Sequence, residues 1–225
     1  MRYSIYILLG FIYTLMGSIA FYVVRTMRRE SRLESSSKGG TMALTPSAMK
    51  ALGYPAPDFS LTDTVSGRRV ALADFKSKKG LLVMFICNHC PYVKHVQDGL
   101  VQLGKDYEKR DLAIVAINAN DAVGYPDDSP EKMAAEAKGK DYRFPYLHDE
   151  TQEVAKAYAA ACTPDFFLYD AARTLVYRGQ FDSSRPGNGI PVTGQDLRAA
   201  IDLVLADTPV PAYQKPSIGC NIKWR

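Results

Sequence analysis

The pattern of hydrophobic positions after residue 50 alternates between runs typical of strands and runs typical of helices. Residues 81–86 and 112–117 are continuously apolar, as expected for strands that are buried on both faces of a sheet. Between them, apolar side chains recur every three or four residues, which predicts an amphipathic helix. These helical positions are Val93, Val96, Leu100, Leu103 and Tyr107.

Shorter elements are predicted on either side of this strand–helix–strand unit. The strands expected to form two hairpins are residues 58–61 with 69–71 and residues 165–169 with 174–178. The other expected elements are helices over 130–138 and 151–160 and a short strand at 145–147.

A last helix is marked by Leu197, Ile201 and Val204 on one face, and Thr193 with Asp196 has the spacing of a capping box. The element order β–α–β–α–β–β–α predicts an α/β fold with a mixed central sheet and helices on both faces. We assign this domain to residues 50–207. We expect residues 208–225 to form an irregular tail that packs on it.

The N-terminal segment differs from the rest of the chain. Residues 3–24 contain no charged side chain, a length that suits a transmembrane helix, and four arginines follow by residue 32. The positive-inside rule then predicts a membrane anchor with the domain on the cytoplasmic side. Two alternatives stay open, a cleavable signal peptide and a soluble cytoplasmic protein that starts at Met42. Residues 25–49, basic and then rich in Ser and Gly, are predicted to be a flexible linker.

The net charge of +4 arises in this segment alone. Residues 1–41 hold six Lys or Arg and two Glu, which leaves 22 of the 28 basic and 22 of the 24 acidic side chains for the remainder. A domain with no net charge and no basic stripe does not indicate a nucleic-acid partner.

Four unevenly spaced cysteines are too few for a secreted disulfide scaffold. Cys87 and Cys90 form a C-x-x-C pair, with Asn88 and His89 between them, where a buried strand is expected to meet a helix. A helix N-terminus lowers the pKa of a cysteine there, because free N–H groups and the helix dipole favour the thiolate. We therefore expect Cys87, at the helix N-cap, to be the nucleophile and Cys90 the resolving thiol. A protonated His89 would further favour the thiolate.

Other uses of a C-x-x-C pair fit this sequence less well. Zinc needs two more ligands, and Cys162 and Cys220 are distant in sequence. Covalent haem needs a histidine directly after the second cysteine, where this chain has a proline. A thiophilic metal such as Cu(I), held by the cysteine pair for delivery, remains an alternative. No cofactor is expected for the redox reaction.

Three stretches allow a comparison with known families. They are residues 56–59 (APDF), 85–93 (FICNHCPYV) and 162–167 (CTPDFF). With these motifs, residues 55–206 resemble the thioredoxin superfamily, in its branch with the alkyl hydroperoxide reductase/thiol-specific antioxidant (redoxin) domain. The ending at 215–224 (KPSIGCNIKW) is similar to that of a bacterial subgroup of such proteins. The resemblance implies a thioredoxin-like three-layer fold, in which a cis Thr163–Pro164 peptide faces the cysteine pair.

The chain departs from the family pattern in two ways. Peroxiredoxins of this family carry Pro and Thr seven and three residues before the reactive cysteine, where this chain has Gly80 and Met84. A dedicated thiol peroxidase is therefore disfavoured. Thioredoxins also keep an acidic residue in the strand below the cysteines, and residues 81–86 contain none. We expect His89 or Asp165 to take the place of that proton acceptor.

Two further cysteines are candidates for an auxiliary role. Cys162 precedes the expected cis-proline by two residues and is either a third redox thiol or a packing residue. Cys220 lies in a tail long enough to reach the site. It is either a redox thiol, with Cys87 or Cys162 as its disulfide partner, or a packing residue.

These features predict a thiol–disulfide oxidoreductase. Cys87 attacks a disulfide in a protein or small-molecule partner, Cys90 resolves the mixed disulfide, and an external thiol reductant or oxidant resets the pair. The membrane is a partner only through residues 3–24.

Overall fold

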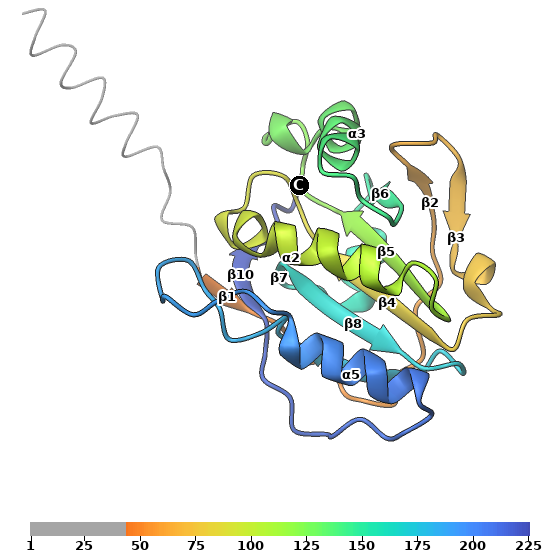
Figure 1. Cartoon of the computed structure of the whole chain (residues 1–225). Helices are drawn as coiled ribbons and strands as arrows, with labels where there is room; N and C mark the ends of the chain where they lie inside the picture. Colours follow the sequence, from red (N-terminus) through yellow and green to blue (C-terminus); the bar gives the residue numbers. More distant parts are fainter. Residues whose placement is uncertain (1–43) are drawn as a thin grey trace, which may run out of the picture. The chain divides into compact units, whose positions relative to one another are not determined.

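The computed structural model describes residues 44–225 (Figure 1). The predicted membrane segment and most of the predicted linker lie outside the described residues, so both stay predictions. From residue 44 onward, no helix is both long enough and apolar enough to cross a membrane.

A seven-stranded mixed sheet forms the centre of the fold, with strand order β3-β2-β6-β5-β4-β8-β9. Its strands are β2 (Ser60–Asp63), β3 (Arg69–Ala71), β4 (Gly80–Phe85), β5 (Leu112–Asn118), β6 (Tyr146–His148), β8 (Asp165–Tyr169) and β9 (Leu175–Gly179). β4 runs parallel to β5 and antiparallel to β8, so it lies in the middle and is buried along its whole length. The continuous apolar run and both predicted hairpins are confirmed, with shifts of one or two residues at their ends.

Helices cover both faces of this sheet, as predicted. They are α2 (Pro91–Tyr107), α3 (Pro130–Gly139), α4 (Glu153–Tyr158) and α5 (Gln195–Leu205), with 3₁₀ turns at Leu72–Phe75 (η1) and Pro126–Asp128 (η2). Leu82 and Met84 of β4 pack in one core with α2, α3 and α5. Their neighbours Leu81 and Val83 point to the opposite core with α4. The period of two along β4 thus separates two apolar layers, and the result is the α/β sandwich in Figure 1.

A smaller sheet joins the two ends of the described chain. β10 (Ile218–Asn221) lies between β1 (Leu44–Pro46) and β7 (Cys162–Thr163), antiparallel to both. Two expectations are corrected by this sheet. Residues 44–46 are a strand and not linker, and the tail is not irregular throughout. Both strands depend on partners distant in sequence, which no local pattern reveals.

The predicted capping box at the start of α5 is wrong. The N-cap is Gly194 in a left-handed conformation (φ 69°), without a side-chain cap. Asp196 instead accepts a hydrogen bond from Gln180 Nε2 at 2.6 Å. The backbone N–H groups of Thr193 and Gly194 bond the buried Asp182 carboxylate at 2.7 and 2.6 Å, so this carboxylate fixes how the chain enters the helix.

Candidate active site

The turn from Cys87 to Cys90 connects β4 to α2. The helix begins at Pro91, and Cys90 is its N-cap with extended backbone (φ −70°, ψ 124°). The prediction that Cys87 is the N-cap is therefore wrong. Proline suits the first helical position because it has no N–H to donate, and it drives the residue before it away from helical geometry.

Both sulfurs of the turn face the peptide between Thr163 and Pro164, which is cis, as the resemblance implied. Cys87 Sγ lies 3.3 Å from Thr163 Oγ1. The Cys90 thiol donates to the Thr163 carbonyl oxygen at 3.2 Å. Cys87 is 2% exposed and Cys90 is 0% exposed, so both side chains are buried and Cys87 lies slightly nearer the surface. Their roles as nucleophile and resolving thiol stay predictions.

A third sulfur completes the group. Cys220 Sγ lies 2.7 Å from Cys90 Sγ, and Cys220 is buried at 1% exposure. The sequence predicts Cys87 or Cys162 as the partner of a redox-active Cys220, whereas the sulfur beside Cys220 in the structure is that of Cys90. β10 pairs antiparallel with β7 in a register that sets Cys220 opposite Thr163, and this register brings the tail thiol to the inner cysteine.

Asp128, in η2, holds the turn from the other side. Its carboxylate accepts the backbone N–H of Asn88 at 2.7 Å and Asn120 Nδ2 at 2.8 Å, and it lies 2.6 Å from His89 Nδ1. Burial raises the pKa of Asp128, but the hydrogen bonds from His89, Asn120 and Asn88 outweigh it, so the pKa is lowered overall. The ring of Tyr125 stacks on His89 with centroids 5.0 Å apart. His89 is thus clamped between an ionised carboxylate and an aromatic ring.

The three cysteines differ in pKa. Burial raises the pKa of the Cys87 thiol, with Cys90 and Asp128 acting in the same direction. The pKa of Cys90 is lowered, first by its hydrogen bond with Cys220 and then by that with Cys87. Of the two cysteines of the turn, Cys90 thus loses its proton more easily.

Cys162 and Asp165 lie in the buried strands behind the turn. Cys162 Sγ donates to the Pro164 carbonyl oxygen at 3.6 Å, and burial raises the pKa of its thiol. Burial raises the pKa of Asp165 to about 7, while its carboxylate accepts the Ala161 N–H at 3.2 Å. These contacts favour the packing role for Cys162. One ring nitrogen of His89 lies within 4.8 Å of Cys87 Sγ, and the choice between His89 and Asp165 as acceptor of the Cys90 proton stays a prediction.

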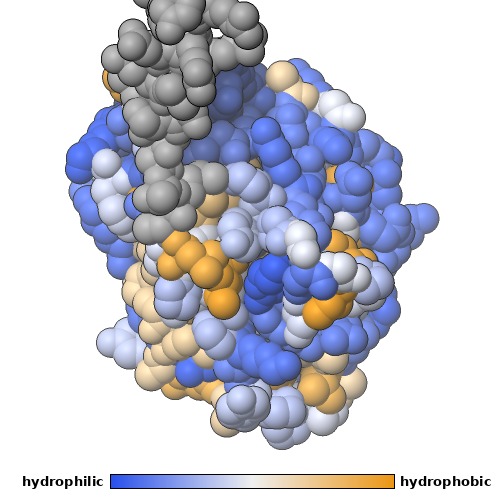
Figure 2. Space-filling view, turned by 90° about the vertical axis from the view of Figure 1, so that its left-hand side faces the viewer, coloured by the Kyte–Doolittle hydropathy of each residue, from blue (hydrophilic) through white to orange (hydrophobic). Residues whose placement is uncertain are grey.

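The surface on this side of the molecule is mixed. Figure 2 shows the side on which β1, β10 and the beginning of α2 lie, and most of the visible surface is hydrophilic, with separate hydrophobic areas. A partner that approaches the turn from here meets both kinds of surface.

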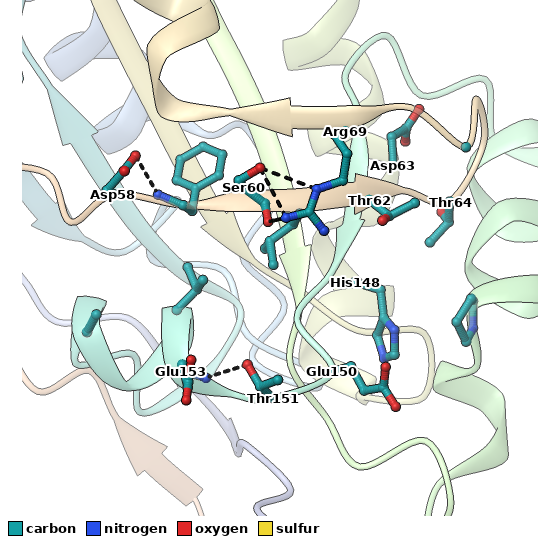
Figure 3. A pocket seen from close by; sticks show the side chains of 16 residues that line it. Asp58, Ser60, Thr62, Asp63, Thr64, Arg69, His148, Glu150, Thr151 and Glu153 are labelled. Carbon is teal, nitrogen blue, oxygen red and sulfur yellow. Dashed lines mark hydrogen bonds between the residues drawn. The ribbon is translucent and has the colours of Figure 1, made fainter.

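A groove of about 810 Å³ lies apart from the cysteines, between β2 and the beginning of α4. Its lining includes Arg69, His148, Glu150 and Glu153, which Figure 3 shows around the hollow, and none of the four cysteines. Burial lowers the pKa of His148. Arg69 donates to the Ser60 hydroxyl on the neighbouring strand β2.

The residues that hold the turn were not predicted from the sequence. Asp128 and Asn120 follow β5, and Tyr146 on β6 donates its hydroxyl to Asn88 Oδ1 at 3.1 Å. The only signal for Asp128 was its place just before a helix, where acidic residues commonly complement the helix dipole. That signal does not distinguish a buried carboxylate that binds the turn, such as Asp128, from an exposed one.

The mixed central sheet with helices on both faces is a thioredoxin-like α/β fold. Residues 52–178, more than half of the chain, match the model of the AhpC/TSA family. The chain belongs to the AhpC/TSA family, whose members are thiol-based redox proteins.

Three other proteins are similar to this chain in sequence, and two of them have solved structures. A protein of Mycobacterium tuberculosis (strain H37Rv) named as a putative peroxiredoxin is 31% identical over 121 residues, covering 53% of this chain and 67% of its own. An uncharacterised conserved protein from Geobacillus kaustophilus has a crystal structure with 58% identity and a TM-score of 0.80, covering 82% of this chain and 97% of its own. A hypothetical protein from Sinorhizobium meliloti reaches 54% identity and a TM-score of 0.79, with coverage of 80% and 98%.

Proposed function

We propose that this protein is a thiol–disulfide oxidoreductase in which Cys87 and Cys90 alternate between dithiol and disulfide. The observation that carries the proposal is that both sulfurs contact one residue, Thr163, at 3.3 and 3.2 Å, beside a cis-proline. A substrate disulfide laid against that peptide would meet the outer sulfur of Cys87 first.

The reaction begins with attack by Cys87 on the substrate disulfide, which forms a Cys87–substrate mixed disulfide and releases the other substrate thiol. Because the pKa of Cys87 is raised and that of Cys90 lowered, the Cys87 proton passes to Cys90 or to His89 during the attack. The released thiolate takes up this proton. Cys90 then attacks Cys87 Sγ, which expels the second substrate thiolate and closes the Cys87–Cys90 disulfide. An external dithiol returns the pair to the reduced state.

Asp128 is a positioning residue in this scheme. Its carboxylate fixes the His89 ring and the Asn88 backbone, so the turn is held before a substrate arrives. Thr163 and Pro164 form the wall against which the substrate disulfide lies.

The test is reduction of insulin disulfides by the full chain with dithiothreitol as reductant. Cys87→Ser should abolish the activity, and Cys90→Ser should trap a mixed disulfide that a non-reducing gel displays. Cys162→Ser is the matched control, because it changes another buried cysteine that the scheme does not use, and it should keep near wild-type rates. Near wild-type reduction by Cys87→Ser would contradict the proposal.

Peroxide reduction is a second candidate. The family supports it, and the Thr163 hydroxyl at 3.3 Å from Cys87 Sγ supplies a donor that Met84 does not. Rates of hydrogen peroxide consumption and insulin reduction, measured on the same preparation, separate the two activities. A peroxidase would consume peroxide at a rate far above its rate of disulfide reduction.

Copper delivery is less well supported by the arrangement of ligands. Cys87 Sγ, a His89 nitrogen and an Asp128 carboxylate oxygen lie within 4.8 Å of one another, but carboxylate suits hard cations, whereas Cu(I) prefers thiolate and thioether. Metal analysis of protein purified without added metal tests this alternative, and a stoichiometric copper content would revive it.

A further inference from the structure

Strand pairing of the C-terminal tail places Cys220 beside Cys90. β10 lies between β1 and β7, and Cys220 is opposite Leu44 on one side and Thr163 on the other. Ser217 donates its hydroxyl to the Pro164 carbonyl oxygen at 2.6 Å. Farther along, the Lys223 N–H donates to Asn120 Oδ1 at 2.8 Å. Asn120 also bonds Asp128, so the tail is tied to both sides of the cysteine turn.

Gly219 shows how closely the tail approaches. A Cβ atom at this position would lie 2.0 Å from the Thr163 carbonyl oxygen and 3.2 Å from Pro164 Cδ. Only glycine allows β10 to come this near to the peptide that the cysteines face. The contact between Cys220 and Cys90 therefore depends on Gly219, which lets the backbone of β10 approach that of β7.

We propose that Cys220 is a third redox thiol, which takes over the disulfide from Cys87 by forming a Cys90–Cys220 bond. This inference rests on the proposed oxidoreductase function and deepens it. A disulfide bond places its sulfur atoms about 2.05 Å apart, so the 2.7 Å between Cys90 Sγ and Cys220 Sγ leaves only a small movement to make.

The step is a thiol–disulfide exchange within the protein. Cys220 Sγ attacks Cys90 Sγ of the Cys87–Cys90 disulfide, the Cys90–Cys220 bond forms, and Cys87 leaves as a thiolate that takes up the proton lost by Cys220. No electrons enter or leave the protein in this step, since one disulfide replaces another. The two electrons that reduced the substrate came from the Cys87–Cys90 pair.

The proton lost by Cys220 ends on Cys87. Burial raises the pKa of Cys87, so its thiolate is readily protonated once released, and the raised pKa of Cys220 means that Cys220 loses its proton as it attacks. The result is that Cys87 regains its thiol while the oxidised bond is stored in the interior, between the start of α2 and the tail. Buried disulfides are shielded from small thiols, and reduction of the stored bond would proceed by reversal through Cys87.

The test is peptide mapping of the full chain after oxidation with oxidised glutathione, followed by alkylation of the remaining thiols. Wild-type protein should yield both Cys87–Cys90 and Cys90–Cys220 peptides. Cys220→Ser should yield Cys87–Cys90 as its intramolecular disulfide, and Cys87→Ser should yield no Cys90–Cys220 peptide, because the bond reaches the buried pair through Cys87. Cys220→Ala repeats the Cys220→Ser measurement with an apolar side chain, in case serine at this buried position impairs folding.

The outcomes separate the two proposals. If wild-type protein yields only the Cys87–Cys90 peptide, as Cys220→Ser and Cys220→Ala do, the third-thiol role is overturned and the oxidoreductase survives. If the Cys220 variants form no Cys87–Cys90 disulfide, the proposed function fails, and the third-thiol role fails with it.

Discussion

Asp128 Oδ2 lies 2.6 Å from His89 Nδ1, so a buried carboxylate outside the C-x-x-C turn sets the orientation of the ring between the two cysteines. The carboxylate is ionised, because three donors lower its pKa against the effect of burial. It accepts the Nδ1 proton and fixes which ring nitrogen is available to the sulfurs. The chemistry of the turn thus depends on a residue that follows it by nearly forty positions.

Replacement of Asp128 by alanine should destabilise the protein and impair disulfide reduction together. The variant leaves the Asn88 N–H, His89 Nδ1 and Asn120 Nδ2 without their acceptor, which costs about 3 kcal/mol in the free energy of unfolding. Urea unfolding and insulin reduction measure the two effects. Asp127→Ala is the matched control, since its neighbouring carboxylate pairs with Lys132 at the surface, and both quantities should stay at wild-type levels. Equal behaviour of the two variants would refute the assigned role of Asp128.

Replacement of His89 by alanine should make the reduction potential of the Cys87–Cys90 pair more negative. An imidazole that takes up a cysteine proton stabilises the thiolate and hence the dithiol form, so its loss favours the disulfide. We expect a shift of about 30 mV, which corresponds to a tenfold change in the exchange equilibrium. Equilibration with glutathione buffers measures it. His95→Ala, which alters a histidine bonded to Ser184 on the same helix, should leave the potential unchanged.

Asp165 should make stability depend on pH between about 4 and 7. Burial raises its pKa to about 7 in the folded protein, so the folded state binds a proton there that the unfolded state has already released. The free energy of unfolding then falls as pH rises, by about 1.4 kcal/mol per unit from this group. Urea unfolding at several pH values should show a shallower fall for Asp165→Asn. Asp98→Asn, at an exposed position on α2, should keep the wild-type slope. An unchanged slope in Asp165→Asn would show that the carboxyl is not protonated in the fold.

Replacement of Gly219 by alanine should displace β10 and separate Cys220 from Cys90. The added Cβ would meet the Thr163 carbonyl oxygen at 2.0 Å, so strand or peptide must move, at a cost of about 2–4 kcal/mol. The yield of the Cys90–Cys220 disulfide should fall at least tenfold, while the Cys87–Cys90 disulfide still forms. Gly139→Ala is the control, because a Cβ there meets nothing within 4 Å. A wild-type yield of the Cys90–Cys220 disulfide in Gly219→Ala would be incompatible with this account.

The central sheet and its helices could be predicted because their signals are local. The six-residue apolar run of β4 predicts a buried strand. Apolar residues every three or four positions in α2 predict a helix with one buried face. β10 has four residues, among them glycine and asparagine, and its pairing is decided by β1 and β7 at distant positions. No periodicity marks such a strand.

The site shows the same division. The cysteine pair and the cis-proline were recognised from contiguous motifs, whereas the start of α2 was misplaced by three residues because the effect of Pro91 on Cys90 was not considered. The contact of Cys220 with Cys90, and not with Cys87, follows from strand register, which sequence spacing alone does not determine.

The position of β10 also bears on how the protein is made. Cys90 and Cys220 are 130 positions apart, so a ribosome adding about 5–20 residues per second needs roughly 7 to 26 s to deliver the second after the first. During that interval the cysteine turn can form with its helix while the strand that covers its inner sulfur has yet to be synthesised. The nascent chain therefore passes through a stage in which Cys90 is open to cellular thiols and oxidants, and the arrival of β10 closes that stage.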